Sequence, residues 1–433
     1  MLQYCRPNVQ HGRAILTCGA RRETIAPGMS SSSSASIFRH RPFRFFILAR
    51  VASTFSFQVL SVAVGWQVYS ISGSAFYLGL VGLAEFVPMF LLTLVVGHVA
   101  DRSDRRKIAR VCQTIEGVAS AALAAATVGS WVSTGVILVI VFVIGAARAF
   151  EGPSMQALMP GLVSAENFPR AAAWSTSATQ TAAIVGPAVG GVLYVAGPIA
   201  VYATTFGLMI IAGVLTSLVQ TQQLPLNREP PTLRSVFAGI RFIRNRPIML
   251  GAISLDLFAV LLGGATALLP AFARDILFTG SWGLGVLRSA PSVGALLMSF
   301  YLAHRPLRRK VGRTMFIAVA VFGVATILFG LSKSFVLSLG ALIVLGGADV
   351  ISMVVRSSLV QLRTPDEMRG RVSAVNSLFV GTSNQLGEFE SGLTASWFGI
   401  VPAVVIGGVG TLIVVLLWIR IFPVLAAAES LDA

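Results

Sequence analysis

The sequence predicts an all-α polytopic membrane protein in which twelve transmembrane helices form two six-helix halves. Only 12% of the residues are charged, about half the fraction of a soluble protein, and the mean hydropathy is +0.80. Apolar windows of about 20 residues, the length that crosses a bilayer, recur from Phe43 to Phe422. Since backbone polar groups inside a bilayer must pair within their own segment, these windows are predicted to be helices.

The predicted helices cover residues 44–69, 76–99, 108–129, 134–157, 171–194, 198–219, 248–272, 282–303, 313–332, 336–360, 371–396 and 401–422. External loops are short, and the longest connection separates the sixth helix from the seventh. The predicted organisation is a disordered cytoplasmic tail (1–42), an N-terminal half (43–219), a cytoplasmic linker (220–247), a C-terminal half (248–423) and a C-terminal tail (424–433). The linker contains a basic, partly amphipathic segment, and Met29 is a candidate start of translation; the alternative is that residues 1–28 are a translated, disordered tail.

Basic residues alternate between loops. Of the 33 Lys and Arg residues, 23 fall in segments that share one side if the chain starts inside, and the opposite loops hold only Arg274 and Lys333. This positive-inside pattern predicts a multi-pass protein of the cytoplasmic (inner) membrane with both termini in the cytoplasm. A nucleic-acid partner is not expected, because its binding surface would concentrate the net charge of +16 on one face. The expected partners are the lipid bilayer and a small-molecule substrate, and the expected state is a monomer with no metal.

A weak internal repeat supports the division into halves. Residues 156–166 are echoed by residues 359–367, and the basic loop at 105–107 is echoed by the one at 308–310. Repeats of this kind are typical of transporters whose two halves are related by an axis along the membrane normal.

A short charged loop joins the second and third predicted helices and contains Gly97, Asp101, Arg102, Arg105 and Arg106. In these residues it resembles the loop at the same place in the major facilitator superfamily. Asp104 stands where the superfamily has a second glycine, a substitution we attribute to the tolerance of Asp for left-handed backbone. We interpret the loop as a gate in which Asp101 faces a helix N-terminus and the arginines pair across the halves in one conformation. The alternative is a solvated loop that obeys only the charge rule.

The fifth predicted helix resembles the Gly-Pro-x-x-Gly-Gly signature of superfamily antiporters at Gly186, Pro187, Gly190 and Gly191, with Ala182 in place of a further glycine. Proline bends a helix and glycines allow close helix approach, so we interpret this segment as a hinge; ordinary packing is the alternative. With the blocks at 365–374 and 384–392, the chain resembles, over residues 40–422, the branch of the superfamily that holds the enterobactin exporter and macrolide and drug efflux proteins.

Ionisable residues inside the apolar windows are candidates for a proton or substrate path, because such groups cost about 3 kcal/mol each at the bilayer centre. The candidates are Glu85, Arg148, Glu151, Asp256, Arg288, Asp349, Arg356 and Glu388, while Arg50, Glu116 and Glu390 also lie within windows. Spacings of three and seven place Arg148 with Glu151, and Asp349 with Arg356, on one helix face, as internal salt bridges or as parts of the path. Asp256, Glu85 and Glu388 have no such partner and are the leading proton carriers, whereas Arg288 is a candidate contact for an anionic substrate.

These features predict a secondary active transporter that exports a small amphipathic molecule, a drug-like compound or a siderophore, in exchange for protons by alternating access. No cofactor is expected besides the proton motive force, since the chain lacks a Gly-x-x-x-x-Gly-Lys-Ser/Thr loop. The alternatives are a facilitator or importer of a metabolite and, in another class, a non-transporting receptor or scaffold. An enzyme is disfavoured, because no histidine lies deep in a window and no nucleophile–base pair stands out. We expect Asp256→Asn and Glu388→Gln to impair uphill transport.

Overall fold

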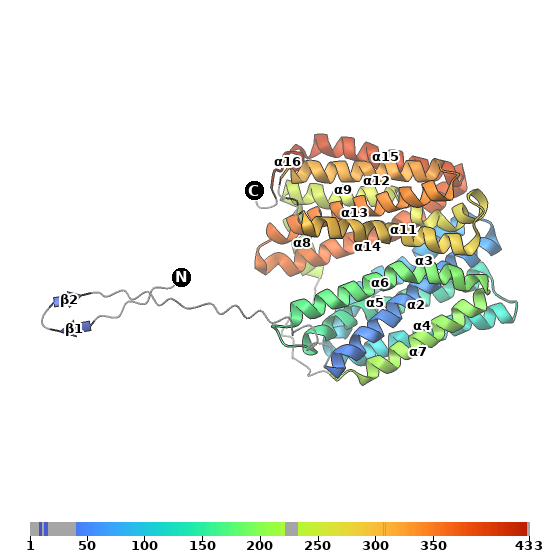
Figure 1. Cartoon of the computed structure of the whole chain (residues 1–433), viewed down its shortest axis with the longest axis horizontal. Coiled ribbons are helices and arrows are strands. Elements are labelled where there is room, and N and C mark those ends of the chain that lie inside the picture. Colours follow the sequence, from blue (N-terminus) through green and yellow to red (C-terminus); the bar gives the residue numbers. More distant parts are fainter. Residues whose placement is uncertain are drawn as a thin grey trace.

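A computed structural model describes residues 8–10, 13–15, 40–220, 233–305, 307 and 309–430, with the backbone alone described at 8–10, 13–15, 93–95, 97–102, 233–236 and 366. In this part of the chain nearly every element is a helix (Figure 1). The exception is an antiparallel pair of three-residue strands, β1 (Asn8–Gln10) and β2 (Arg13–Ile15).

The N-terminal half contains α2 (Arg41–Ser72), α3 (Ala75–Arg102), α4 (Arg105–Val128), α5 (Thr134–Leu158), the short η1 (Met159–Gly161), α6 (Phe168–Val195) and α7 (Pro198–Leu218). The linker helix α8 (Leu233–Arg244) leads to the C-terminal half, which contains α9 (Pro247–Leu262), α11 (Gly280–His304), α12 (Val311–Leu331), α13 (Phe335–Leu362), α14 (Asp366–Phe398), α15 (Ile400–Ile421) and the short α16 (Pro423–Ala426). The predicted all-α fold with two six-helix halves is confirmed.

Eleven helical segments among the described residues are long and apolar enough to cross a membrane. The remaining predicted span, 371–396, lies within α14, a helix of 33 residues that packs along α3 and α9. Its lower hydropathy comes from polar residues such as Asn384, Gln385 and Glu388. Because all three of these residues line a cavity between the halves, α14 has less need of an apolar surface than its neighbours.

The seventh predicted helix, expected to run unbroken over 248–272, is instead interrupted. After α9 ends at Leu262, the chain continues through a 3-10 turn, η2 (Ala265–Leu268), a single α-helical turn, α10 (Leu269–Ala271), and a π-helical turn, η3 (Phe272–Ile276). The break falls at Gly263 and Gly264, which have low helix propensity. A Cβ on Gly264 would lie 2.6 Å from the carbonyl oxygen of Gly387, so the close approach of α14 requires glycine there.

The two halves lie side by side, the N-terminal one in blue to green and the C-terminal one in yellow to red (Figure 1). Separate buried apolar clusters hold each half together. One includes Val59, Ile137 and Tyr202 in the N-terminal half, and another includes Leu255, Met315 and Leu359 in the C-terminal half. Each half therefore has a core of its own, and a further buried cluster joins Val62 and Ala75 of the N-terminal half to residues of the C-terminal half such as Leu268.

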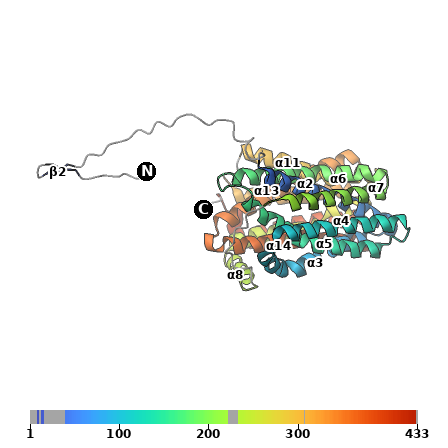
Figure 2. The same cartoon turned by 90° about the horizontal axis from the view of Figure 1, so that it is seen from below.

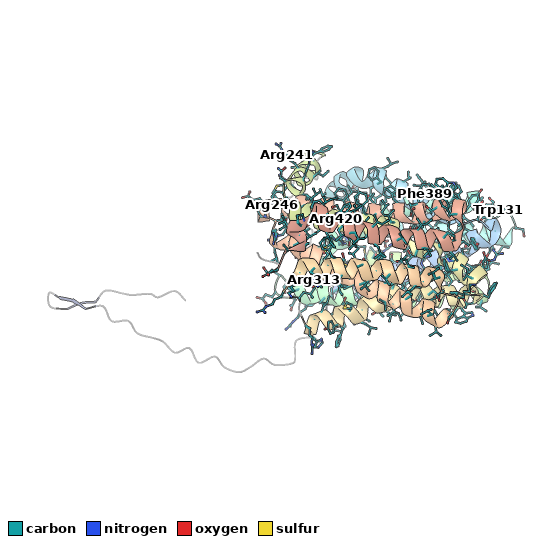
Figure 3. The ribbon with its side chains drawn as sticks, turned by 90° about the horizontal axis from the view of Figure 1, so that it is seen from above. Trp131, Arg241, Arg246, Arg313, Phe389 and Arg420 are labelled. Atoms are coloured by element: carbon teal, nitrogen blue, oxygen red, sulfur yellow. The ribbon has the colours of Figure 1, made fainter. Side chains whose placement is uncertain are left out.

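Basic residues gather at one end of the bundle. Arg241, Arg246, Arg313 and Arg420 lie there, whereas Trp131 lies at the other end (Figure 3). We call these the basic end and the opposite end. The linker helix α8 lies at the basic end beside α14, where Gly239 approaches the backbone of Arg371 (Figure 2). Lys333, between α12 and α13, belongs to the opposite end, so the alternation predicted for the loops is present in the fold.

Candidate functional site

A cavity of about 970 Å³ lies between the two halves. Residues of α2, α3, α5 and α6 line it on one side, and residues of α9 and of α11 to α14 line it on the other. Four of the described lining residues are charged: Glu85, Arg288, Asp349 and Glu388. All four were predicted from their position inside apolar segments, and the fold brings them to one space.

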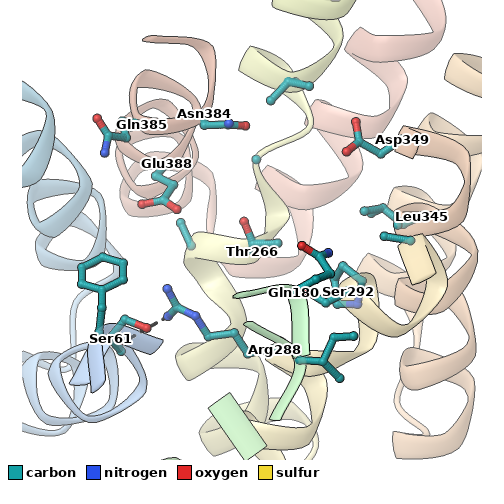
Figure 4. A pocket seen from close by; sticks show the side chains of 18 of the residues that line it. Ser61, Gln180, Thr266, Arg288, Ser292, Leu345, Asp349, Asn384, Gln385 and Glu388 are labelled. Atoms are coloured by element: carbon teal, nitrogen blue, oxygen red, sulfur yellow. Dashed lines mark hydrogen bonds between the residues drawn. The ribbon is translucent and has the colours of Figure 1, made fainter. Parts of the chain in front are cut away.

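Arg288 crosses from one half towards the other. Its guanidinium Nη1 donates a hydrogen bond of 3.4 Å to the backbone oxygen of Ser61 on α2. Figure 4 shows this guanidinium and the carboxylate of Glu388 pointing towards one another from α11 and α14. Glu85 on α3 lies within electrostatic range of both Arg288 and Glu388. Two acids therefore lie within electrostatic range of one arginine on this wall of the cavity.

Asp256 and Arg356 form a buried ion pair away from the cavity lining. The guanidinium Nη1 of Arg356 donates to the carboxylate Oδ2 of Asp256, and the hydroxyl of Ser352 donates to its Oδ1 at 3.1 Å. The prediction that Asp256 has no partner is therefore wrong. So is the expected pairing of Asp349 with Arg356, because Arg356 is turned to α9 and Asp349 lines the cavity. Sequence spacing finds partners on one helix and misses those on a neighbouring one.

A second buried polar cluster lies inside the N-terminal half. The guanidinium Nη1 of Arg148 lies 3.7 Å from Glu151 Oε2, which confirms the predicted pair, and 3.5 Å from Glu116 Oε2. Glu151 also accepts hydrogen bonds from Ser53 (2.6 Å) and Gln113 (2.9 Å). The guanidinium of Arg148 stacks over the ring of Phe57, a cavity residue, at 3.6 Å. This cluster therefore sits directly behind the cavity wall.

Close contacts between the halves close the cavity towards the opposite end. A Cβ on Gly191 of α6 would lie 2.9 Å from the Cα of Gly285 on α11, and one on Gly79 of α3 would lie 3.1 Å from the Cα of Gly392 on α14. Gly186 and Gly190 instead face α2 of their own half, at Gln58 and Val59. The predicted close approach at the fifth-helix signature is confirmed, although α6 runs through Pro187 without a break.

A polar contact strengthens this closure. The hydroxyl of Tyr69, near the end of α2, donates to the carboxylate of Asp275 in η3, and Arg274 Nη1 donates to the backbone oxygen of Tyr69 at 3.0 Å. At the basic end, by contrast, the lining residues Thr176, Gln180 and Ser299 are exposed. The cavity therefore opens towards the basic end.

The predicted gating loop lies at the basic end. Asp104 caps α4 with an extended backbone (φ −62°) and accepts a 2.9 Å hydrogen bond from the backbone N–H of Arg106, so the expected left-handed conformation is wrong. Hydrogen bonding from Arg106 lowers the pKa of the Asp104 carboxyl. Arg105 and Arg106 also donate to backbone oxygens of Ala157 and Val219 in their own half. The side chains of Gly97, Asp101 and Arg102 lie outside the described residues, and the gate stays a prediction.

Several polar residues of the site escaped sequence reasoning. Uncharged side chains from four α-helices and the 3-10 turn η2 line the cavity, at Ser61, Gln180, Thr266, Ser292, Asn384 and Gln385 (Figure 4). One signal was available: Ser292 follows Arg288 by four residues and Gln385 precedes Glu388 by three, which are helix-face spacings. Glu116, the second acid beside Arg148, was visible as a charge but not as a member of the cluster.

This arrangement, two helical halves around a polar cavity open at one end, is that of a membrane transporter. The chain matches the family described as transmembrane secretion effector over residues 32–433, and it belongs to that family of the major facilitator superfamily. Curated relatives include the enterobactin exporters EntS of Escherichia coli O1:K1, 26% identical over 87% of this chain and 90% of the relative, and of Citrobacter koseri, 27% identical over 87% and 91%.

Solved transporters share the fold. The nucleoside transporter NupG superposes with a TM-score of 0.69 at 15% identity, covering 88% of this chain and 99% of that chain. A bacterial homologue of the iron transporter ferroportin, solved in an inward-facing state, superposes with a TM-score of 0.67 at 17% identity over 90% and 99%. The chain is thus a multi-pass membrane transporter by fold and family, a class whose members are generally not enzymes.

Proposed function

We propose that this protein is a proton-coupled exporter that moves a small amphipathic molecule out of the cytoplasm by alternating access. The observation that carries the proposal is the cavity between the halves, which combines apolar walls with Glu85, Arg288, Asp349 and Glu388 and opens at one end only. A carboxyl group that faces such a cavity exchanges protons with whichever side the cavity is open to. Substrate and proton then compete for the same charged wall, which is the basis of antiport.

The likeness to enterobactin exporters supports export as the direction. The positions of the basic loops support a membrane orientation in which the basic end, and with it both termini, lies in the cytoplasm of the inner membrane. In that orientation the cavity described here is open to the cytoplasm, the state in which an exporter collects its substrate. Exchange with external protons then requires the contacts at Gly191, Gly79 and Tyr69 to separate.

Proton movement in proteoliposomes tests the proposal. The protein is reconstituted with an imposed ΔpH and a panel of lipophilic cations, macrolides and catecholate siderophores. We expect one class of compound to collapse ΔpH, and Glu388→Gln to abolish that response because an amide, unlike a carboxyl group, does not ionise near neutral pH. If Glu388→Gln and Asp256→Asn both keep full ΔpH-driven transport, neither acid couples protons; transport that proceeds only down its own gradient contradicts antiport and favours a facilitator.

A further inference from the structure

The charge of the cavity walls indicates the charge of the molecule that binds there. Among the described lining residues, three are acids (Glu85, Asp349 and Glu388) and one is a base (Arg288). Charges in a site of low dielectric act strongly on a ligand, since little water screens them. A cavity with this composition attracts a cation and repels an anion.

The one lining base is already engaged. Arg288 donates to the backbone oxygen of Ser61, faces the carboxylate of Glu388 and lies within range of Glu85 (Figure 4). Arg148, behind the wall, lies 3.5 Å from Glu116 and 3.7 Å from Glu151, which are closer contacts with acids than any found for Arg288 among the described residues. An anionic ligand at either arginine would also lie near two carboxylates, and like charges repel. The expectation that Arg288 meets an anionic substrate therefore loses its support.

Asp349 provides a second acid, on the other side of the cavity. Its nearest cation along the chain, Arg356, is bound to Asp256, and no ion pair of Asp349 is found among the described residues. On the α14 wall, the side-chain oxygen Oε1 of Gln385 is buried and has no described hydrogen-bond partner. The carboxylate of Asp349 and the amide oxygen of Gln385 can therefore accept a hydrogen bond from a positively charged donor or interact with a cationic centre.

The uncharged polar residues of the lining are interspersed with apolar and aromatic ones, with Phe57 and Phe322 on opposite halves and Met353 and Leu296 nearer the open end. Aromatic faces attract cations, and apolar walls hold hydrocarbon substituents. We propose that the cavity binds a lipophilic organic cation, a quaternary onium or a protonated amine, between Asp349 and the Glu85–Glu388 wall. The proposal rests on the transport function proposed above only in taking this cavity as the substrate site.

Equilibrium binding to the detergent-purified full-length protein tests this directly. The probes are tetraphenylphosphonium and tetraphenylborate, which have nearly the same shape and opposite charge. We expect saturable binding of the phosphonium and at least tenfold weaker binding of the borate. Glu388→Gln and Asp349→Asn are each expected to weaken phosphonium binding about tenfold or more, whereas Glu388→Asp, which keeps the charge, retains most of it.

Glu390→Gln is the matched control. Glu390 lies on the same helix two residues from Glu388, accepts a hydrogen bond from Thr394 at 2.7 Å and is not among the lining residues, so its loss should leave binding unchanged. The proposal is overturned if the borate binds more tightly than the phosphonium, or if no saturable phosphonium binding is found. It is also overturned if Glu388→Gln and Asp349→Asn leave phosphonium binding unchanged. This experiment measures binding without transport. If phosphonium binds through Glu388 but its addition never moves protons in proteoliposomes, the cation site is supported and the proposed antiport is contradicted.

Discussion

The carboxylate of Asp256 and the guanidinium of Arg356 lie in the closed core between α9 and α13, each only 4–5% exposed. Charges buried this deeply persist because each stabilises the other. Removing one partner of such a pair costs about 3–5 kcal/mol, since it leaves an uncompensated buried charge. The pair therefore stabilises the fold, whereas an acid that couples protons faces the cavity and needs no such buried partner.

This role makes a prediction about stability. Asp256→Asn should lower the melting temperature of the detergent-purified protein by several degrees, and Asp256→Asn with Arg356→Gln should recover part of the loss. Ser352→Ala, which removes one hydrogen bond to Asp256 and no charge, should cost only about 1 kcal/mol. Equal melting temperatures for the wild type and Asp256→Asn would argue against a structural pair. A transport defect of Asp256→Asn can be assigned to proton coupling only if the melting temperature shows that the variant is still stably folded.

The two polar clusters also show how far residue-level prediction reaches. Arg148 and Glu151 were paired correctly because they lie three residues apart on one helix. Asp256 and Arg356 are 100 residues apart, and nothing in the sequence pattern says that α9 and α13 turn those positions towards each other. Burial inside an apolar segment predicts that a charge needs a partner, but identifying the partner needs the packing of the helices.

The seventh span shows the same limit at the scale of an element. Its apolar composition predicts a helix, and α9 is one up to Leu262. The interruption depends on Gly263 and Gly264, and a glycine in an apolar helix can serve either as a packing position or as a break. The close fit of Gly264 against Gly387 of α14 distinguishes the two outcomes, and that contact is visible only in the fold. The break places Gly263, Gly264 and Thr266 on the cavity wall.

The π-helical turn η3 that ends this span carries the polar contact to α2. Tyr69→Phe removes the hydrogen bond to Asp275 and leaves the aromatic ring in place. Hydrogen bonds to charged groups contribute about 1.5–3 kcal/mol, so the population with an open opposite end should rise about tenfold or more. Spin labels on α3 and α14 at the opposite end should report a larger share of long distances.

Tyr77→Phe is the control for this measurement, because Tyr77 lies at the same end of the bundle and its hydroxyl forms no hydrogen bond among the described residues. An identical distance distribution for Tyr69→Phe and the wild type would show that the contact with Asp275 does not hold the halves together. Weaker binding without a change in distance would place Tyr69 in the site instead of the closure.

At the scale of the whole molecule, the division into six and six helices was predictable, because helix lengths, the linker and the alternation of basic loops are all properties of local sequence. The conformation, with the cavity closed at the opposite end, was not predictable from the sequence. The same apolar windows are compatible with a cavity open at either end, and the choice rests on contacts between helices far apart in the chain. Gly79 is 313 residues from Gly392 (392 − 79) and Gly191 is 94 residues from Gly285 (285 − 191), yet these contacts set which end is closed.

The glycine contact between α6 and α11 therefore gives a test of the movement between halves. A Cβ on Gly191 would lie 2.5 Å from the backbone oxygen of Ser281 and 2.9 Å from the Cα of Gly285, distances that a packed side chain does not tolerate. Gly191→Ala should force the halves apart at this end and shift the protein towards the state open there. A cysteine introduced on α11 at this end should then react faster with a membrane-impermeant maleimide added from outside the cell.

Gly340→Ala is the matched control, because Gly340 of α13 has no atom within 4 Å of the added Cβ and lies near the same end. It should leave the labelling rate unchanged. If the two halves rock as rigid bodies, opening one end closes the other. Gly191→Ala should then also slow the labelling of a cysteine introduced at Ser299, near the basic end, by a reagent supplied from the cytoplasmic side. Faster labelling at both ends would mean a loosened bundle, and faster labelling at the opposite end alone would mean a local gate without movement of the halves.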